Sequence, residues 1–223
     1  MSVVKDAKTR VLLVDDHPMI RQGLAALINE EPNLMVCGEA GSKRQGLELI
    51  AALQPNLAIV DISLDEGDGI ELIKEVRARY PHVLLLVLSM HDEGVYAERA
   101  VRAGAGGYVM KAEAAETVMA AIHCVLSGKI YISAKVTDQL LRWVGSGRKD
   151  TRSSKSPVER LTDRELQIFQ LLGEGVRVRE IATQLYISTK TVESHRVNIK
   201  EKLGLQTSAE LLRYAIQNSH INR

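Results

Sequence analysis

Short apolar runs alternate with amphipathic stretches five times in the first 127 residues, and this alternation limits the fold more than any other feature. Residues 10–14 form an apolar run, after which apolar residues recur at helical spacing from Ile20 to Ile28. Further apolar runs, each followed by such a stretch, lie at residues 34–38, 57–60, 83–88 and 107–110. Apolar strands separated by helices are typical of a parallel sheet covered on both faces. The sequence therefore predicts an α/β fold with a five-stranded, doubly wound parallel sheet.

Polar residues follow the predicted strands where each strand ends. They are Asp15 and Asp16 after the first strand, Asp61 after the third, Ser89 after the fourth and Lys111 after the fifth. The carboxyl ends of parallel strands lie at one edge of a sheet, so we expect these side chains to converge. An isolated acidic pair such as Asp15-Asp16 more often caps the helix that follows. The presence of Asp61 and Lys111 at matching strand ends favours a functional site instead.

Several carboxylates at one edge repel each other unless a cation lies among them, and oxygen ligands suit Mg²⁺. With Mg²⁺ present, Asp61 could attack a phosphoryl group as a carboxylate nucleophile, while Lys111 neutralises the phosphoryl oxygens. The Ser89 hydroxyl could then donate to a phosphoryl oxygen and move a loop. This chemistry predicts a switch rather than a turnover site, so we do not expect an enzyme.

The C-terminal third differs in charge from the rest of the chain. Residues 1–146 carry 15 Lys+Arg against 19 Asp+Glu, whereas residues 147–223 carry 14 against 9. The second part is therefore the candidate for binding a polyanion. The two cysteines show no metal-ligand spacing and no disulfide pattern, which fits a reducing cytosol. No signal segment or membrane-spanning run is apparent, so we expect a cytoplasmic protein without a membrane partner.

A helix-turn-helix is predicted near the C-terminus. Thr162 to Glu165 forms a capping box that opens one helix, and Ser188 caps a later helix that would read DNA. On that helix we expect basic residues to contact phosphates and other exposed residues to contact base edges. The candidate DNA-binding residues are Lys190, Thr191, Glu193, Ser194, Arg196, Val197 and Lys200.

With these residues in place, the chain resembles the NarL/FixJ subfamily of bacterial response regulators. Residues 8–127 resemble a receiver domain, residues 128–157 a linker helix with a flexible tether, and residues 158–221 a LuxR-type helix-turn-helix. The resemblance implies a phosphoacceptor at Asp61, switch and phosphoryl contacts at Ser89, Tyr108 and Lys111, and Mg²⁺ ligands at Asp15, Asp16, Asp61 and the carbonyl of Ser63. It places Glu193, Ser194 and Val197 at base-facing positions.

The same resemblance implies the partners. A sensor histidine kinase would donate the phosphoryl group, double-stranded promoter DNA would be bound, and the last helix would contact a second copy in a homodimer on DNA. Three segments depart from the family pattern: Leu64–Gly69 carries two extra carboxylates, at Asp65 and Glu66, and lacks a proline; Ala112 replaces a common proline; and Arg177 stands where a hydroxyl cap is usual.

Other functions fit the residues less well. An aspartyl-phosphate phosphatase would need a second acid two positions after Asp61, where this chain has Ser63. A dinucleotide-binding enzyme would need a glycine-rich turn after the first strand, and none is present. A receiver that dimerises without phosphorylation is a third alternative, supported only by the altered loop at Asp65 and Glu66. We also expect a linker helix over residues 130–144, able to pack on either domain.

Overall fold

The computed structural model describes residues 8–64, 68–91, 93–134, 136–138, 157–185 and 187–219. The chain divides into two compact units, with the division after Gly145. Of the described residues, 8–138 belong to the first unit and 157–219 to the second. The altered loop at Asp65 and Glu66 lies outside the described residues, and so does all of the predicted tether at 145–157 except Pro157.

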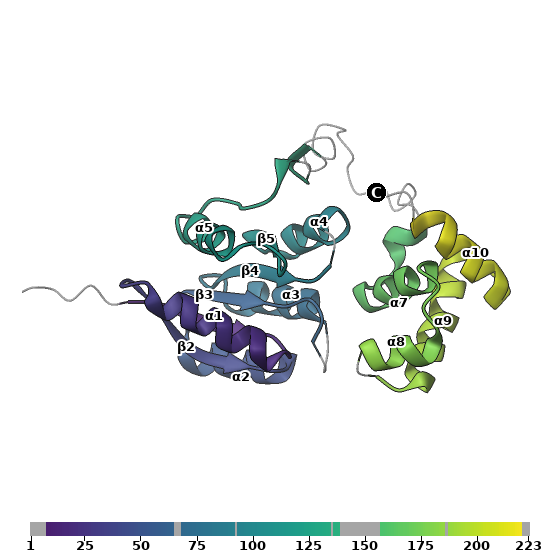
Figure 1. Ribbon diagram of the computed structural model, residues 1–223, viewed down its shortest axis with the longest axis horizontal. Coiled ribbons are helices and arrows are strands. Elements are labelled where there is room, and N and C mark those ends of the chain that lie inside the picture. The colour runs from purple at the N-terminus through teal and green to yellow at the C-terminus, as the bar shows by residue number, and fades with distance from the viewer. Residues whose placement is uncertain are drawn as a thin grey trace, which may run out of the picture. The chain divides into compact units, whose positions relative to one another are not determined.

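The first unit is a five-stranded parallel sheet with the strand order β2-β1-β3-β4-β5 (Figure 1). This order, with crossover helices, is that of flavodoxin-like doubly wound folds, so the predicted fold class is confirmed. The elements are β1 (Thr9–Val14), α1 (Pro18–Glu30), β2 (Leu34–Ala40), α2 (Lys43–Leu53), β3 (Leu57–Val60), α3 (Gly69–Arg79), β4 (Leu84–Ser89), α4 (Glu93–Ala103), β5 (Gly107–Met110) and α5 (Ala115–Leu126).

Strands β1, β3, β4 and β5 are mostly buried because helices cover both faces of the sheet, whereas the edge strand β2 buries only its two end residues. Leu24 and Ile28 of α1 pack with Val118 and Ile122 of α5 against the side chains of β1, β3 and β4 on one face. Helices α2, α3 and α4 are adjacent in that order, and their buried residues include Ile50, Leu72 and Ala100. Continuous apolar sequences are required in the central strands, since neither of their two sides meets water.

Helix α3 begins directly against the strand end that carries Asp61. Asp68 caps the helix by accepting from the Ile70 N–H at 2.8 Å, and the Gly69 N–H donates to the Ile62 carbonyl at 2.9 Å. A Cβ atom at Gly69 would lie only 2.0 Å from the Asp61 carbonyl oxygen. Only glycine allows the two backbones to approach this closely, and their contact fixes the position of Asp61.

The second unit is helical. It comprises a short 3₁₀ turn, η1 (Pro157–Arg160), and the helices α7 (Asp163–Gly173), α8 (Val178–Gln184), α9 (Thr189–Leu203) and α10 (Ser208–Ser219). Its core joins all four helices through apolar side chains that are 2% exposed or less, namely Ile168, Phe169, Ile181, Val192, Ile199, Leu211 and Ala215. The small apolar faces of these helices can be buried only against one another.

The prediction of a helix over residues 130–144 is wrong at its start. Tyr131 is in extended conformation and forms a parallel bridge with Gly107, and helical structure begins only at Ala134. An unpaired backbone edge of β5 is available at this point, and pairing with it satisfies hydrogen bonds that a helix would have made internally. The part of the predicted helix after residue 138 lies outside the described residues.

Candidate functional site

The carboxyl ends of four neighbouring strands bring the candidate residues of the first unit to one rim. Val14 pairs with Val60, Val60 with Val87, and Ser89 with Met110 across adjacent strands. Asp15, Asp61 and Lys111 each follow the last residue of β1, β3 or β5, and Ser89 is the last residue of β4. Strand register therefore places Asp15 and Asp61 at the same level of the sheet, and it places Ser89 one residue and Lys111 two residues farther out at the same edge.

Lys111 joins the two buried carboxylates of this rim. Its Nζ atom lies 2.6 Å from Asp15 Oδ2 and 2.7 Å from Asp61 Oδ2, and the side chains of Lys111 and Asp61 are each 2% exposed. Burial alone would lower the pKa of Lys111, but the charge of Asp61 and hydrogen bonds to both carboxylates outweigh it and raise this pKa. The ammonium group is therefore charged and held between two acids.

The ionised form of the Asp61 carboxyl is disfavoured by its surroundings. Its pKa is raised from 3.8 to about 6, chiefly by burial; the charge of Lys111 opposes this rise and the charge of Asp15 adds to it. The Ser63 N–H also donates to Asp61 Oδ1 at 3.3 Å. An ionised carboxylate that is poorly solvated is a suitable nucleophile or ligand, because a new positive partner stabilises it strongly.

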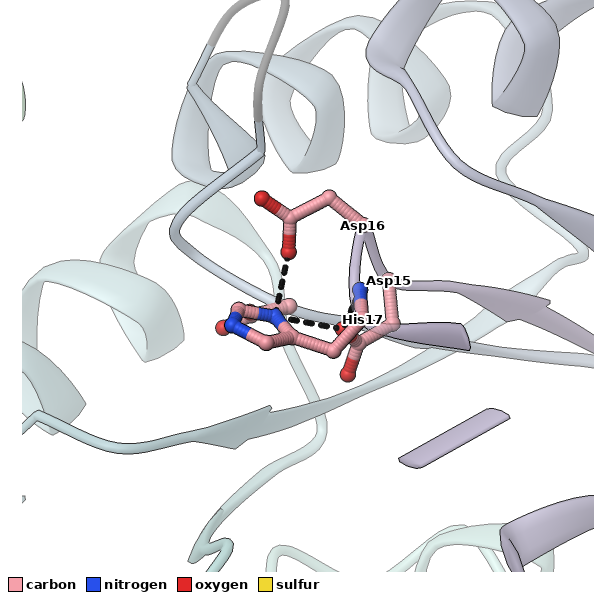
Figure 2. A group of neighbouring side chains, drawn as sticks. Asp15, Asp16 and His17 are labelled. Atoms are coloured by element: carbon pink, nitrogen blue, oxygen red, sulfur yellow. Dashed lines mark hydrogen bonds and ion pairs between the residues drawn. The ribbon is translucent and has the colours of Figure 1, made fainter. Parts of the chain in front are cut away.

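His17 lies beside the acidic pair. Figure 2 shows its imidazole ring turned back toward the carboxylates of Asp15 and Asp16, and the Nδ1 atom lies 2.5 Å from Asp16 Oδ1 and 3.3 Å from Asp15 Oδ1. The His17 N–H also donates to Asp15 Oδ1 at 2.8 Å. The Asp16 side chain is 6% exposed and that of His17 45% exposed. The histidine thus covers the acidic pair from the solvent side.

The donor set of the rim fits a hard divalent cation. One potential ligand atom from each of Asp15, Asp16, His17 and Asp61 lies within 4.8 Å of the other three. Three of the four donors are carboxylates, and Mg²⁺ favours oxygen ligands together with water. The residues present therefore suit Mg²⁺, and a bound cation would relieve the repulsion between Asp15 and Asp61.

A hydrogen-bond network connects Ser89 with Tyr108 through His91. The Ser89 Oγ atom accepts from the His91 N–H at 3.3 Å, and the Tyr108 hydroxyl donates to the His91 carbonyl at 2.9 Å. His91 Nε2 lies 2.7 Å from Ser63 Oγ, and its ring lies 4.8 Å from the ring of Tyr96. Ser89 and Tyr108 are buried. These contacts leave His91 half-buried.

In the second unit, an ion pair ties α9 to the start of α7. The Thr162 N–H donates to Glu165 Oε2 at 2.8 Å, and Thr162 Oγ1 accepts from the Glu165 N–H at 3.3 Å, so the predicted capping box is present. Lys202 Nζ lies 2.6 Å from the same Glu165 Oε2. Burial would raise the pKa of Glu165, but these hydrogen bonds lower it instead. The contacts fix the orientation of α9 within the unit.

The surface of α9 presents most of the candidate DNA-binding residues to solvent. Ser188 caps the helix by accepting from the Thr191 N–H at 3.0 Å. The exposed candidates are Lys190, Thr191, Glu193, Ser194 and Val197, and the half-buried ones are Arg196 and Lys200. Arg196 forms an ion pair with Glu193 at 2.6 Å and its side chain is only 17% exposed. The positive charge of Arg196 is thus partly neutralised by a neighbour on the same helix.

Comparisons with known proteins agree with both units. Residues 11–123 match the family model described as the response regulator receiver domain, and residues 159–215 match that of the bacterial regulatory proteins of the luxR family. The chain is 30% identical over 210 residues to the oxygen regulatory protein NreC of Staphylococcus aureus. The aligned residues cover 93% of this chain and 97% of that protein. The chain belongs to the response regulators. The resemblance inferred from its residues is confirmed.

Solved structures of response regulators resemble this one along most of its length. RcsB from Salmonella enterica serovar Typhimurium, bound to promoter rprA in the presence of phosphomimetic BeF3-, is 25% identical, with a TM-score of 0.59 and coverage of 94% of this chain and 98% of that one. A two-component response regulator of the LuxR family from Aurantimonas sp. SI85-9A1 is 29% identical, with a TM-score of 0.57 and coverage of 62% and 99%. Within the described residues of this response regulator, no helix is long and apolar enough to cross a membrane.

Two contacts of the rim were not predicted from the sequence. The sequence places His17 next to Asp16, but only the fold shows that its ring turns back onto both carboxylates. His91 follows the end of β4 by two residues, a position that signals proximity to Ser89, yet its bond to Ser63 depends on how two loops meet. Short-range spacing could have suggested the first contact and could not have suggested the second.

Proposed function

We propose that this response regulator accepts a phosphoryl group on Asp61 and thereby controls the binding of promoter DNA by α9. The observation that carries the proposal is the placement of the Lys111 ammonium within 2.7 Å of both Asp61 and Asp15 at the rim of the sheet. An Asp61 carboxylate oxygen would form the new bond to phosphorus as the bond to the donor breaks, and Lys111 would neutralise charge on the phosphoryl oxygens.

Mg²⁺ would be held by the carboxylates of Asp15, Asp16 and Asp61 and by the backbone carbonyl of Ser63. When bound, the cation supplies charge neutralisation for the incoming phosphoryl group. Ser89 Oγ would donate to a phosphoryl oxygen, and the Tyr108 hydroxyl, already bonded to the His91 carbonyl, would follow the resulting movement of the loop. A sensor histidine kinase would be the physiological donor.

The proposed DNA contacts are divided by chemistry. Lys190, Arg196 and Lys200 would contact phosphates, while Glu193, Ser194 and Val197 would face base edges and Thr191 would contact the DNA at the start of α9. The solved RcsB complex with promoter DNA supports this proposal for the second unit. A regulator that binds promoter DNA acts in the cytoplasm of a bacterium, and residues 158–221 would form its DNA-binding domain.

We further propose a homodimer on DNA. Leu212 and Ile216, one turn apart on α10, are 42% and 41% exposed, whereas Leu211 and Ala215 beside them are fully buried. RcsB has been solved as two dimers bound to two parallel DNAs, at 26% identity and a TM-score of 0.56. Burying two exposed apolar side chains against their copies would stabilise such a dimer, and symmetric half-sites would follow in the DNA.

The first experiment treats the full chain with Mg²⁺ and acetyl phosphate and measures intact mass and promoter-DNA affinity. We expect the wild type to gain one phosphoryl adduct and to change its affinity, and Asp61→Asn to do neither. Glu71→Gln, which alters an exposed carboxylate on α3, serves as the matched control and should behave as wild type. DNA binding without any adduct would instead favour a receiver that acts without phosphorylation.

A second experiment tests Arg196 as a phosphate contact. Arg196→Ala should weaken binding to all DNA sequences alike and lower the slope of log affinity against log salt by about one, because one fewer counterion is released. Arg44→Ala, at an exposed arginine of α2, should leave the slope unchanged. An unchanged slope for Arg196→Ala would show that its pairing with Glu193 persists on DNA and that it does not contact phosphate.

A further inference from the structure

The segment after α5 is attached to the free edge of the sheet. We call residues 130–134 and 136–138 the strap. The Tyr131 N–H donates to the Gly106 carbonyl at 2.9 Å, and the Tyr131 carbonyl accepts from the Tyr108 N–H at 2.9 Å. A Cβ atom at Gly107 would lie 2.9 Å from the Tyr131 carbonyl oxygen. The glycine therefore allows the strap to approach β5 closely enough to add one parallel bridge to its edge.

A second anchor holds the strap to the start of α4. The Ser133 N–H donates to Glu93 Oε1 at 2.8 Å. Ser133 then opens the short helical turn that follows, since its carbonyl accepts from both the N–H and the hydroxyl of Thr137 at 3.0 Å. Val136 in this turn has no exposed surface. The strap is thus held by backbone pairing at one end and by a charged hydrogen bond with a buried apolar side chain at the other.

Both anchors are connected to the rim that carries Asp61. Tyr108 binds the strap through its backbone N–H and binds the His91 carbonyl through its hydroxyl. Glu93 lies two positions after His91, whose N–H donates to Ser89 Oγ. A movement of Ser89 toward a phosphoryl group on Asp61 would therefore displace His91, and His91 is connected to each of the two residues that hold the strap.

We propose that the strap is a conformational relay: it is clamped by Glu93 and by the β5 edge in the unphosphorylated receiver and is loosened when Asp61 is phosphorylated. The proposal rests on the proposed function, because it takes phosphorylation of Asp61 as the trigger. The strap is the last part of the first unit that the structure describes, and the chain continues from it toward the DNA-binding unit. Loosening the strap would free the start of the covalent connection to that unit from the β5 edge and from Glu93.

Hydrogen–deuterium exchange of the full chain, read at the Ser133 amide and at peptides covering the strap, tests the relay. In wild type with Mg²⁺, we expect acetyl phosphate to speed exchange of the Ser133 amide by on the order of tenfold, the protection that one hydrogen bond to a charged group provides. Glu93→Ala should exchange at this faster rate without acetyl phosphate. Glu93→Gln retains an acceptor oxygen and should remain protected.

Glu98→Ala is the matched control, because Glu98 lies on the same helix and pairs only with Arg102 at 3.3 Å among the contacts described. It should exchange as wild type does. Intact mass, measured on the same samples, separates the two proposals. If no adduct forms, the proposed function fails and the relay with it. If the adduct forms on Asp61 and strap exchange does not change, or if Glu93→Ala exchanges like Glu98→Ala, the relay alone is overturned.

Discussion

Replacing Lys111 with methionine lowers the free energy of unfolding of the first unit by about 2–3 kcal/mol at pH 7 without Mg²⁺, and we expect calorimetry of the full chain to show this loss. The variant removes the cation that lies 2.6–2.7 Å from Asp15 and Asp61, and methionine retains the apolar volume. The loss is limited because a buried carboxylate can take up a proton, which costs about 4 kcal/mol at pH 7 for a carboxyl of ordinary pKa. For Asp61 the cost of protonation at pH 7 is smaller, because its pKa is already raised in the folded protein.

The same reasoning predicts how the loss in Lys111→Met depends on conditions. It should shrink toward pH 5, where a proton replaces the missing ammonium charge, and it should also shrink when Mg²⁺ binds the folded state. Lys74→Met removes an exposed lysine that pairs with Glu71 at 2.6 Å on α3 and should change stability by less than about 0.5 kcal/mol. A similar small effect for Lys111→Met would mean that the two carboxylates do not depend on this cation.

The sheet and its rim could be predicted from the sequence because both follow from short-range patterns. Apolar runs that end in Asp15, Asp61, Ser89 or Lys111 define the strand ends, and a parallel sheet then brings those ends together. Thr162 and Ser188 likewise predicted the starts of two helices, because a helix cap involves only residues three positions apart. These signals need no information about distant parts of the chain.

The remaining features depend on contacts between segments that lie far apart in the sequence, and no local pattern indicates which segments meet. Tyr131 pairs with Gly107 because β5 is an edge strand, and the apolar spacing after residue 130 gave no sign of this and predicted a helix instead. His91 binds Ser63 across 28 positions of sequence. Arg196 was predicted as an outward phosphate contact, yet it also pairs with Glu193, because residues three apart on a helix share a face.

Asp61→Asn should stabilise the first unit at neutral pH in the absence of Mg²⁺, although it removes the residue on which the proposed function depends. The pKa of Asp61 is 3.8 in the ordinary state and about 6 in the folded protein, so folding favours the protonated carboxyl. The ionised form therefore lowers stability at every pH above about 6, by roughly 3 kcal/mol for a shift of this size. The penalty disappears as the pH falls below 3.8, because both states are then protonated.

Asparagine imitates the neutral carboxyl, and Lys111 keeps Asp15 as its partner in the variant. We therefore expect a gain of about 2–3 kcal/mol at pH 7.5 in a chelating buffer, measured by denaturant unfolding, that falls to near zero by pH 4. Glu71→Gln, at an exposed carboxylate, should give no such pH-dependent gain. A gain that stays constant with pH, or a loss at pH 7.5, would contradict the raised pKa. With Mg²⁺ in excess the order should reverse, since the cation binds more tightly to the chain that keeps the Asp61 carboxylate and therefore stabilises it more. Such a reversal would show that the ionised Asp61 carboxylate destabilises the folded protein without Mg²⁺ and that bound Mg²⁺ removes this destabilisation.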